Sequence, residues 1–161
     1  IITALPELAT EHAEEIGIVD YLFCTTKSYD LENNIQQLRP LIGSSTIIIP
    51  LLNGVNITER IQRILPNAKV WYGCVYIGAR LAAPGQVNRF TTGDFLWFGK
   101  PEEDKEQQEL LLKILTDAGI NALNPPDILL HVWKKFFLIS TGATLTSYYN
   151  QSIGQILEFH K

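Results

Sequence analysis

Residues 17–26 read GIVDYLFCTT, an apolar run in which most residues are β-branched or aromatic. Such a run is typical of a strand that is buried on both faces of a parallel sheet. Two more runs of this kind follow, TIIIPLL at residues 46–52 and KVWYGCVYIG at residues 69–78. The sequence therefore predicts three buried strands in the first half of the chain.

The segments between these runs have helical patterns. Asp30 can cap a helix with apolar residues at positions 31, 35, 38 and 41, and Gly43 ends that helix. Asn56 and Glu59 stand three residues apart, as in a capping box, at the start of ITERIQRIL. Strands alternate with helices, which predicts βαβ units and a parallel sheet with right-handed crossovers.

After residue 78 the pattern changes. Ala83-Pro84-Gly85 predicts a turn, and the segments GQVNRFT (85–91) and DFLWFGK (94–100) predict short antiparallel strands. A helix is expected from about Asp104 to Ala118, with Gly119 as its C-cap.

Pro125-Pro126-Asp127 marks a boundary, because prolines disfavour helix just before them and Asp127 can cap the long segment that follows. We therefore predict an α/β fold in two parts. Residues 1–126 form the C-terminal part of a Rossmann-like parallel-sheet domain, and residues 127–161 form the start of an all-helical substrate domain.

Composition and charge exclude several classes of protein. The formal net charge of -4, with acidic and basic residues interleaved, argues against a nucleic-acid binder or a polybasic membrane surface. No apolar run reaches the roughly 18 residues of a membrane span, and no signal peptide is recognisable. With only two cysteines, which form no CxxC pair, a reducing cytoplasm is the default expectation. The only cysteines, Cys24 and Cys74, form no CxxC pair, and the three histidines lack metal-ligand spacing, so we assign no disulfide and no metal: His12, His131 and His160.

The ends of the chain have two unusual features. It opens on IITALPEL, which is typical of the tail of a strand, and it contains no methionine, where average usage of about 2% predicts roughly three. We expect the sequence to be a piece of a longer chain.

Two polar residues close the first two predicted strands, Lys27 and Asn53. In an open α/β sheet, ligands bind beyond the carboxyl ends of the strands. A lysine there offers a positive charge to a phosphate or carboxylate, and an asparagine offers both a donor and an acceptor. The alternative is that Lys27 is a solvated loop residue and that Asn53 only supplies a turn with Gly54.

Lys135 lies on a predicted helix that is apolar nearly all round. At about 100° per residue it aligns with Val132 and Ile139 and not with a polar face. Burial would lower its pKa and suit it to donate a proton to a carbonyl oxygen under reduction. The alternative is that its ammonium snorkels to water, as expected for Lys134 on another face. No histidine has the spacing of a hydrolase triad with the serines and threonines of this segment.

Four segments together resemble the ketopantoate reductase (2-dehydropantoate 2-reductase) family. They are VDYLFCTTKSYD (19–30), IIIPLLNGVN (47–56), GARLAAPGQV (78–87) with FGK after it, and DILLHVWKKFFL (127–138). They occur in the family's order and cover nearly the whole chain.

The resemblance implies NADPH-dependent reduction of 2-dehydropantoate to (R)-pantoate, in the pathway to pantothenate and coenzyme A. It implies an N-terminal Rossmann domain and a C-terminal helical domain with the active site between them, and it allows a homodimer through the helical domain. Lys27 and Asn53 match the family's cofactor-side residues, and Ala79 falls where a backbone group meets NADP. Lys135, in the W-x-K pattern, matches the catalytic proton donor and contacts substrate.

The sequence departs from the family at several positions. Ile139 and Ala143 stand where the family has substrate-binding asparagines, and a third asparagine position falls near Ile153, with Asn150 close by as a candidate substrate ligand. The G-x-G-x-x-G loop is absent, so these residues alone are expected to bind NADPH poorly and to be inactive. Two alternatives stay open: a sister reductase for a less polar 2-oxo acid, and a nucleotide-binding paralogue without turnover.

Overall fold

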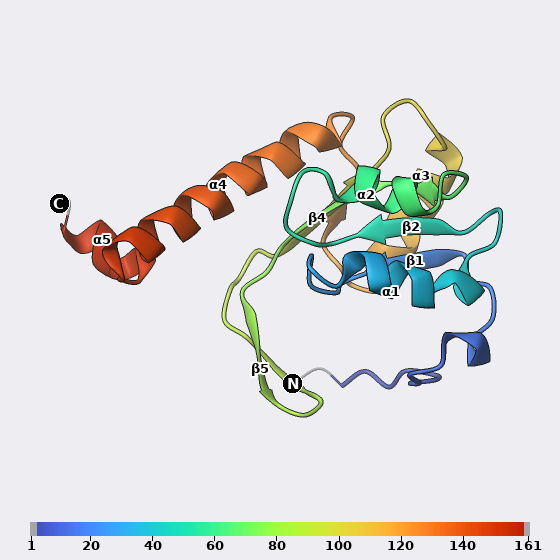
Figure 1. Cartoon of the computed structure of the whole chain (residues 1–161), viewed down its shortest axis with the longest axis horizontal. Helices are drawn as coiled ribbons and strands as arrows, with labels where there is room; N and C mark the ends of the chain where they lie inside the picture. Colours follow the sequence, from blue (N-terminus) through green and yellow to red (C-terminus); the bar gives the residue numbers. More distant parts are fainter. Residues whose placement is uncertain (1–2, 160–161) are drawn as a thin grey trace. The chain divides into compact units, whose positions relative to one another are not determined.

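A computed structural model describes residues 3–159 of the chain (Figure 1). These residues divide into two compact units. The first comprises the residues up to 52 together with 56–71, and the second comprises 53–55 together with the residues from 72 onward. The predicted domain division at residue 126 concerns the longer protein and stays a prediction.

The first unit is built on a parallel sheet of three strands in the order β1-β2-β3, as the βαβ pattern predicts. The strands are Tyr21–Cys24, Ile47–Pro50 and Lys69–Val70. Their register pairs Tyr21 with Ile47 and Ile47 with Lys69. The strands are shorter than their apolar runs, and β2 is buried along its whole length.

Two helices connect these strands. They are α1 (Leu31–Gln37), continued by the 3-10 turn η2 (Arg39–Leu41), and α2 (Ile57–Ile64); a further 3-10 turn, η1 (Ala13–Glu15), precedes the sheet. Apolar side chains of α1 and α2 form a single core with the sheet, and its fully buried members are Leu31, Ile35, Ile48, Ile61 and Val70. Both helices begin where predicted, but neither Asp30 nor Asn56 makes a side-chain capping hydrogen bond.

The second unit contains a sheet of order β4-β7-β8 and a separate two-stranded ribbon. In the sheet, β4 (Tyr72–Tyr76) runs antiparallel to β7 (Phe95–Gly99), and β7 runs parallel to β8 (Ala122–Leu123). In the ribbon, β5 (Ala79–Ala83) pairs antiparallel with β6 (Gln86–Arg89). The predicted turn joins them, with Gly85 at a positive φ of 71°.

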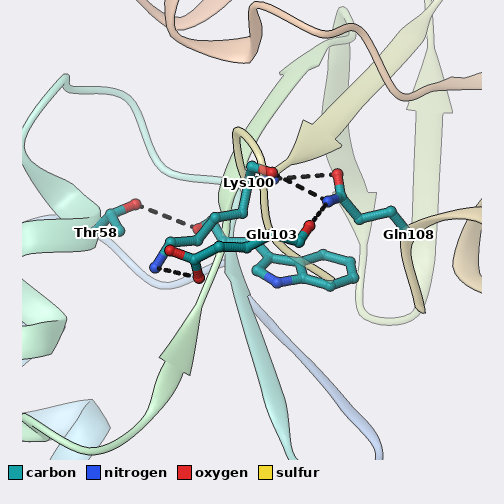
Figure 2. A network of polar contacts seen from close by, with 5 residues as sticks. Thr58, Lys100, Glu103 and Gln108 are labelled. Carbon is teal, nitrogen blue, oxygen red and sulfur yellow. Dashed lines mark hydrogen bonds and ion pairs between the residues drawn. The ribbon is translucent and has the colours of Figure 1, made fainter. Parts of the chain in front are cut away.

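The single strand predicted over residues 69–78 is wrong, because Trp71 divides it into β3 and β4. The side chain of Trp71 is fully buried, and its backbone N–H donates to the Ile48 carbonyl at 3.0 Å. The Thr58 hydroxyl, labelled in Figure 2, donates to the Trp71 carbonyl at 3.3 Å. These contacts fix Trp71 in the first unit, and the residues after it pair with β7. Apolar periodicity could not show this change of sheet.

Helix α3 (Lys105–Asp117) follows β7 and is joined to it by the side chain of Gln108. Gln108 accepts from the Lys100 N–H at 3.2 Å and donates to the carbonyls of Lys100 and Glu103 (Figure 2). Asn124 donates to Gln108 at 2.6 Å and to the Phe98 carbonyl at 2.9 Å. Gln108, at the centre of this polar network, is 6% exposed, and its hydrogen bonds hold the end of β7 in place.

The long helix α4 (Ile128–Tyr149) and the short α5 (Ile153–Phe159) complete the described chain (Figure 1). As predicted, Asp127 caps α4, accepting a hydrogen bond from the Leu130 N–H at 3.1 Å. Only Ile128 and Val132 of α4 are buried, and large apolar side chains on its other faces are exposed, among them Trp133, Phe137 and Tyr148. Even so, none of the helices in residues 3–159 is long and apolar enough to cross a membrane.

Candidate active site

The candidate site is built where α4 packs against the sheet of the second unit. Ile128 and Val132 of α4 form a buried cluster with Cys74 of β4, and Trp97 of β7 packs against that cluster. Lys135 follows Val132 by three residues, so it lies on the same side of the helix one turn further along. The local pattern of α4 thus directs Lys135 toward the edge of β4.

The ammonium of Lys135 has two neighbours on β4. Its Nζ donates a hydrogen bond to the Val75 carbonyl at 2.6 Å, and it lies 5.7 Å from the centroid of the Tyr76 ring. Strand β4 is at the edge of its sheet, where alternate carbonyls point away from the partner strand. A lysine at this edge is held by the backbone and keeps two further N–H donors.

Burial shifts the pKa of this lysine and of the neighbouring Cys74 thiol. It lowers the pKa of Lys135, and the electrostatic effect of Cys74 partly offsets the change. Burial also raises the pKa of the Cys74 thiol, against a smaller lowering by Lys135. Lys134, one residue earlier, is exposed. The difference between the two lysines is the one that the helical projection predicted.

An aromatic group stands beside Lys135. The Tyr76 ring meets Trp97 edge-on at 5.1 Å and 83°, and Trp97 stacks on Phe95 at 5.6 Å and 6°. The ring of His131, on α4, lies 4.6 Å from Trp97. Neither Val75 nor Tyr76 was singled out from the sequence. The alternation of side chains along GCVYIG would have placed Cys74 and Tyr76 on one face of β4.

Lys27 belongs to the first unit and is exposed, three residues after the end of β1. The strand that precedes Lys27 and the strand that precedes Asn53 are parallel neighbours, so the predicted parallel arrangement of these two strands is confirmed. Arg60 of α2 holds the backbone next to Lys27, because its guanidinium donates to the Ser28 carbonyl at 2.6 Å and pairs with Glu32 at 2.7 and 2.8 Å.

Asn53 and Ala79 belong to the second unit, and both are exposed. Asn53 lies in the segment between β2 and α2, and Val55 in the same segment packs against the cluster of Cys74, Ile128 and Val132. Ala79 opens β5 and directly follows Gly78. A Cβ at Gly78 would lie 2.4 Å from a Thr91 methyl group, so the close packing at this position favours glycine.

The residues predicted to contact substrate lie along α4. Asn150 ends the helix in the left-handed conformation, with φ 50°, and its side chain is exposed. Ile139 is 42% exposed, and Ala143 is also exposed. Their roles toward a substrate stay predictions, as do those of Lys27, Asn53, Ala79 and Lys135.

Metal ligands are not gathered anywhere in the part of the chain that the structure describes. Within residues 3–159 no three His, Cys, Asp or Glu side chains form a group that could hold a metal ion. His160 lies outside the described residues.

Comparison with known proteins gives a consistent result. The family model of ketopantoate reductase PanE/ApbA matches residues 2–103, more than half of the chain. The 2-dehydropantoate 2-reductase of Aquifex aeolicus is 24% identical over 157 residues, which are 96% of this chain and 51% of that protein. A crystal structure of 2-dehydropantoate 2-reductase from Porphyromonas gingivalis superposes with a TM-score of 0.84 at 44% identity, covering 93% of this chain and 53% of that one.

A further solved structure is D-mandelate dehydrogenase with NADH and anilino(oxo)acetate. Its TM-score is 0.66 at 25% identity, covering 80% of this chain and 40% of that one. The chain thus spans about half the length of the relatives that it matches.

Proposed function

The chain belongs to the ketopantoate reductase PanE/ApbA family of oxidoreductases, and on that premise we propose that the full-length protein reduces 2-dehydropantoate to (R)-pantoate with NADPH. This reaction is a step of pantothenate and coenzyme A biosynthesis, and we place it in the cytoplasm. Relatives named 2-dehydropantoate 2-reductase support the substrate.

The observation that carries the proposal is the environment of Lys135. Reduction of a 2-oxo acid adds a hydride to the carbonyl carbon and a proton to the carbonyl oxygen. A donor for that proton has to be protonated at working pH and yet give its proton up readily. A lysine whose pKa is lowered by burial gives up its proton more readily than an exposed lysine, and Lys135 is held by the Val75 carbonyl at 2.6 Å with two N–H donors remaining.

The residues proposed to hold the cofactor fit a dinucleotide by their chemistry. Lys27 is an exposed cation beyond the carboxyl end of a parallel strand, where phosphate groups bind in such sheets. Asn53, exposed after the neighbouring strand, offers amide hydrogen bonds, and Ala79 offers its backbone. NADPH, when bound, would supply the hydride. A solved relative contains NADH, so the choice between the two nucleotides is part of the test.

A second candidate substrate class follows from two positions on α4. Ile139 and Ala143 are apolar where ketopantoate reductases have asparagines, and Asn150 is the nearest amide on the same helix. An apolar pocket favours an apolar substrate by only about 10–200-fold per methylene, whereas a hydrogen-bonding pocket discriminates by about 10⁴ or more. A less polar 2-oxo acid is therefore the alternative substrate.

Steady-state oxidation of NADPH and NADH by the full-length protein, with a panel of 2-oxo acids, tests the proposal. The proposal predicts turnover with 2-dehydropantoate and a faster reaction with NADPH than with NADH. Faster turnover of 2-oxoisovalerate or of an aromatic 2-oxo acid would favour the sister reductase. Nucleotide binding without turnover of any 2-oxo acid would contradict the proposal and favour a binding paralogue.

A further inference from the structure

The Tyr76 side chain forms one wall around the Lys135 ammonium. The Nζ atom lies 5.7 Å from the centre of the ring, within the roughly 6 Å over which a cation is attracted to an aromatic face. The same Nζ donates to the carbonyl of Val75, the preceding residue of β4, at 2.6 Å. Two adjacent residues of one strand therefore fix both the direction and the surroundings of the amine.

The Tyr76 ring is itself held in place. It packs edge-on against Trp97 at 5.1 Å and 83°, and Trp97 is stacked on Phe95 at 5.6 Å. Phe95 is also the partner of Tyr76 in the ladder between β4 and β7. A ring fixed by a strand pair and by a second aromatic ring has little freedom to leave the lysine. The contact is thus a property of the rigid sheet.

We propose that Tyr76 is a positioning residue for Lys135, whose aromatic face keeps the ammonium protonated and directed at the edge of β4. This inference rests on the proposed function, since it concerns the proton that Lys135 would donate. Burial alone disfavours the charged form of a lysine. The negative face of an aromatic ring favours the charged form and so opposes the effect of burial, as the electrostatic effect of Cys74 also does.

The other ionisable groups around Lys135 lie on α4 itself and on the elements that pack against it. Strand β4 contributes the Tyr72 phenol and the Cys74 thiol, whose pKa is raised by burial. On α4, His131 lies one turn before Lys135, and the exposed Lys134 precedes it directly. Strand β7 contains no ionisable side chain. Helix α5 packs against α4 at Gly142, two turns from Lys135, and its one ionisable residue is the exposed Glu158. A substitution at position 76 removes the ring and leaves these ionisable side chains in the chain.

The experiment is a titration of the Lys135 side chain by NMR in full-length protein with ¹³C-labelled lysine, using a Lys135→Arg variant to assign the resonance. Tyr76→Leu and Tyr76→Met remove the ring but keep an apolar side chain. Tyr76→Phe keeps the ring face. Phe95→Leu is the packing control, because it disturbs the same aromatic group without touching the lysine.

Loss of the ring should lower the pH midpoint of the Lys135 titration by about 0.4 to 1.5 pH units, the range expected for a cation–π contact. Tyr76→Phe and Phe95→Leu should leave the midpoint where it is in the wild type. If Leu or Met at position 76 leaves the midpoint unchanged, or if Phe95→Leu moves it equally, Tyr76 has no specific role and the inference is overturned. The midpoint is read without turnover, so a failure of the proposed function would be seen separately, in the oxidation assay.

Discussion

Replacing Lys135 by alanine in the full-length protein should slow the chemical step and leave the fold intact. The ammonium sits at the edge of β4 with one N–H bonded to the Val75 carbonyl. If it also protonates the substrate oxygen, its contribution is made mainly in the transition state, so kcat should fall more than KM rises. General acid catalysis is worth about 10²–10⁴-fold, so we expect kcat to fall by at least roughly a hundredfold, or about 2.7 kcal/mol in the activation barrier.

Lys134→Ala is the matched control, because Lys134 is the adjacent residue of the same helix and is exposed. It should change kcat little. Steady-state oxidation of NADPH measures both variants, and circular dichroism checks that both are folded. Equal and small effects of the two substitutions would refute the assignment, and the proton would then have to come from another group or from water.

The remaining predictions concern the fold and the choice of substrate. Gly99→Ala should destabilise the protein by about 1–3 kcal/mol and lower the midpoint of thermal unfolding, because φ at Gly99 is 151° and a Cβ there would lie 2.7 Å from the Asn124 amide nitrogen. An unchanged midpoint would show that Asn124 and Gln108 can move aside at little cost. Asp127→Ala should cost about 0.5–2 kcal/mol in urea unfolding through loss of the cap on α4, and Asp127→Asn should cost less. Adding amides with the double change Ile139→Asn and Ala143→Asn should raise kcat/KM for 2-dehydropantoate relative to 2-oxoisovalerate by at least about tenfold, and a ratio that does not rise would show that these positions do not contact substrate.

Local signals in the sequence predicted much of this fold. The apolar runs that end before Lys27 and Asn53 are parallel neighbours, and the Asp127 cap begins the long helix at the predicted residue. These features depend on a few adjacent residues, so a single sequence can reveal them. The prediction of a single strand across Trp71 was wrong for a different reason. The two halves of this apolar run pair with different strands from distant parts of the chain, β3 with β2 and β4 with β7.

The candidate site was predictable only in part. The helical projection separated Lys135 from Lys134, because burial on α4 follows the helical period. The partners of Lys135 come from β4, about 60 residues earlier in the chain, and one of them is a backbone carbonyl that no side-chain pattern can indicate. The role of Tyr76 depends on the pairing of β4 with β7, which only the structure provides.

The proton-donor role of Lys135 is tested most directly by the pH dependence of kcat in the full-length wild type and in Lys135→Ala. A general acid must be protonated to act, so activity should fall as the pH rises through its pKa. Burial lowers the pKa of Lys135, so the decline in kcat as the pH rises should have its midpoint at a pH lower than the ordinary lysine pKa of about 10.4. The residual activity of Lys135→Ala should lack this alkaline decline. The same decline with the same midpoint in both proteins would contradict the assignment.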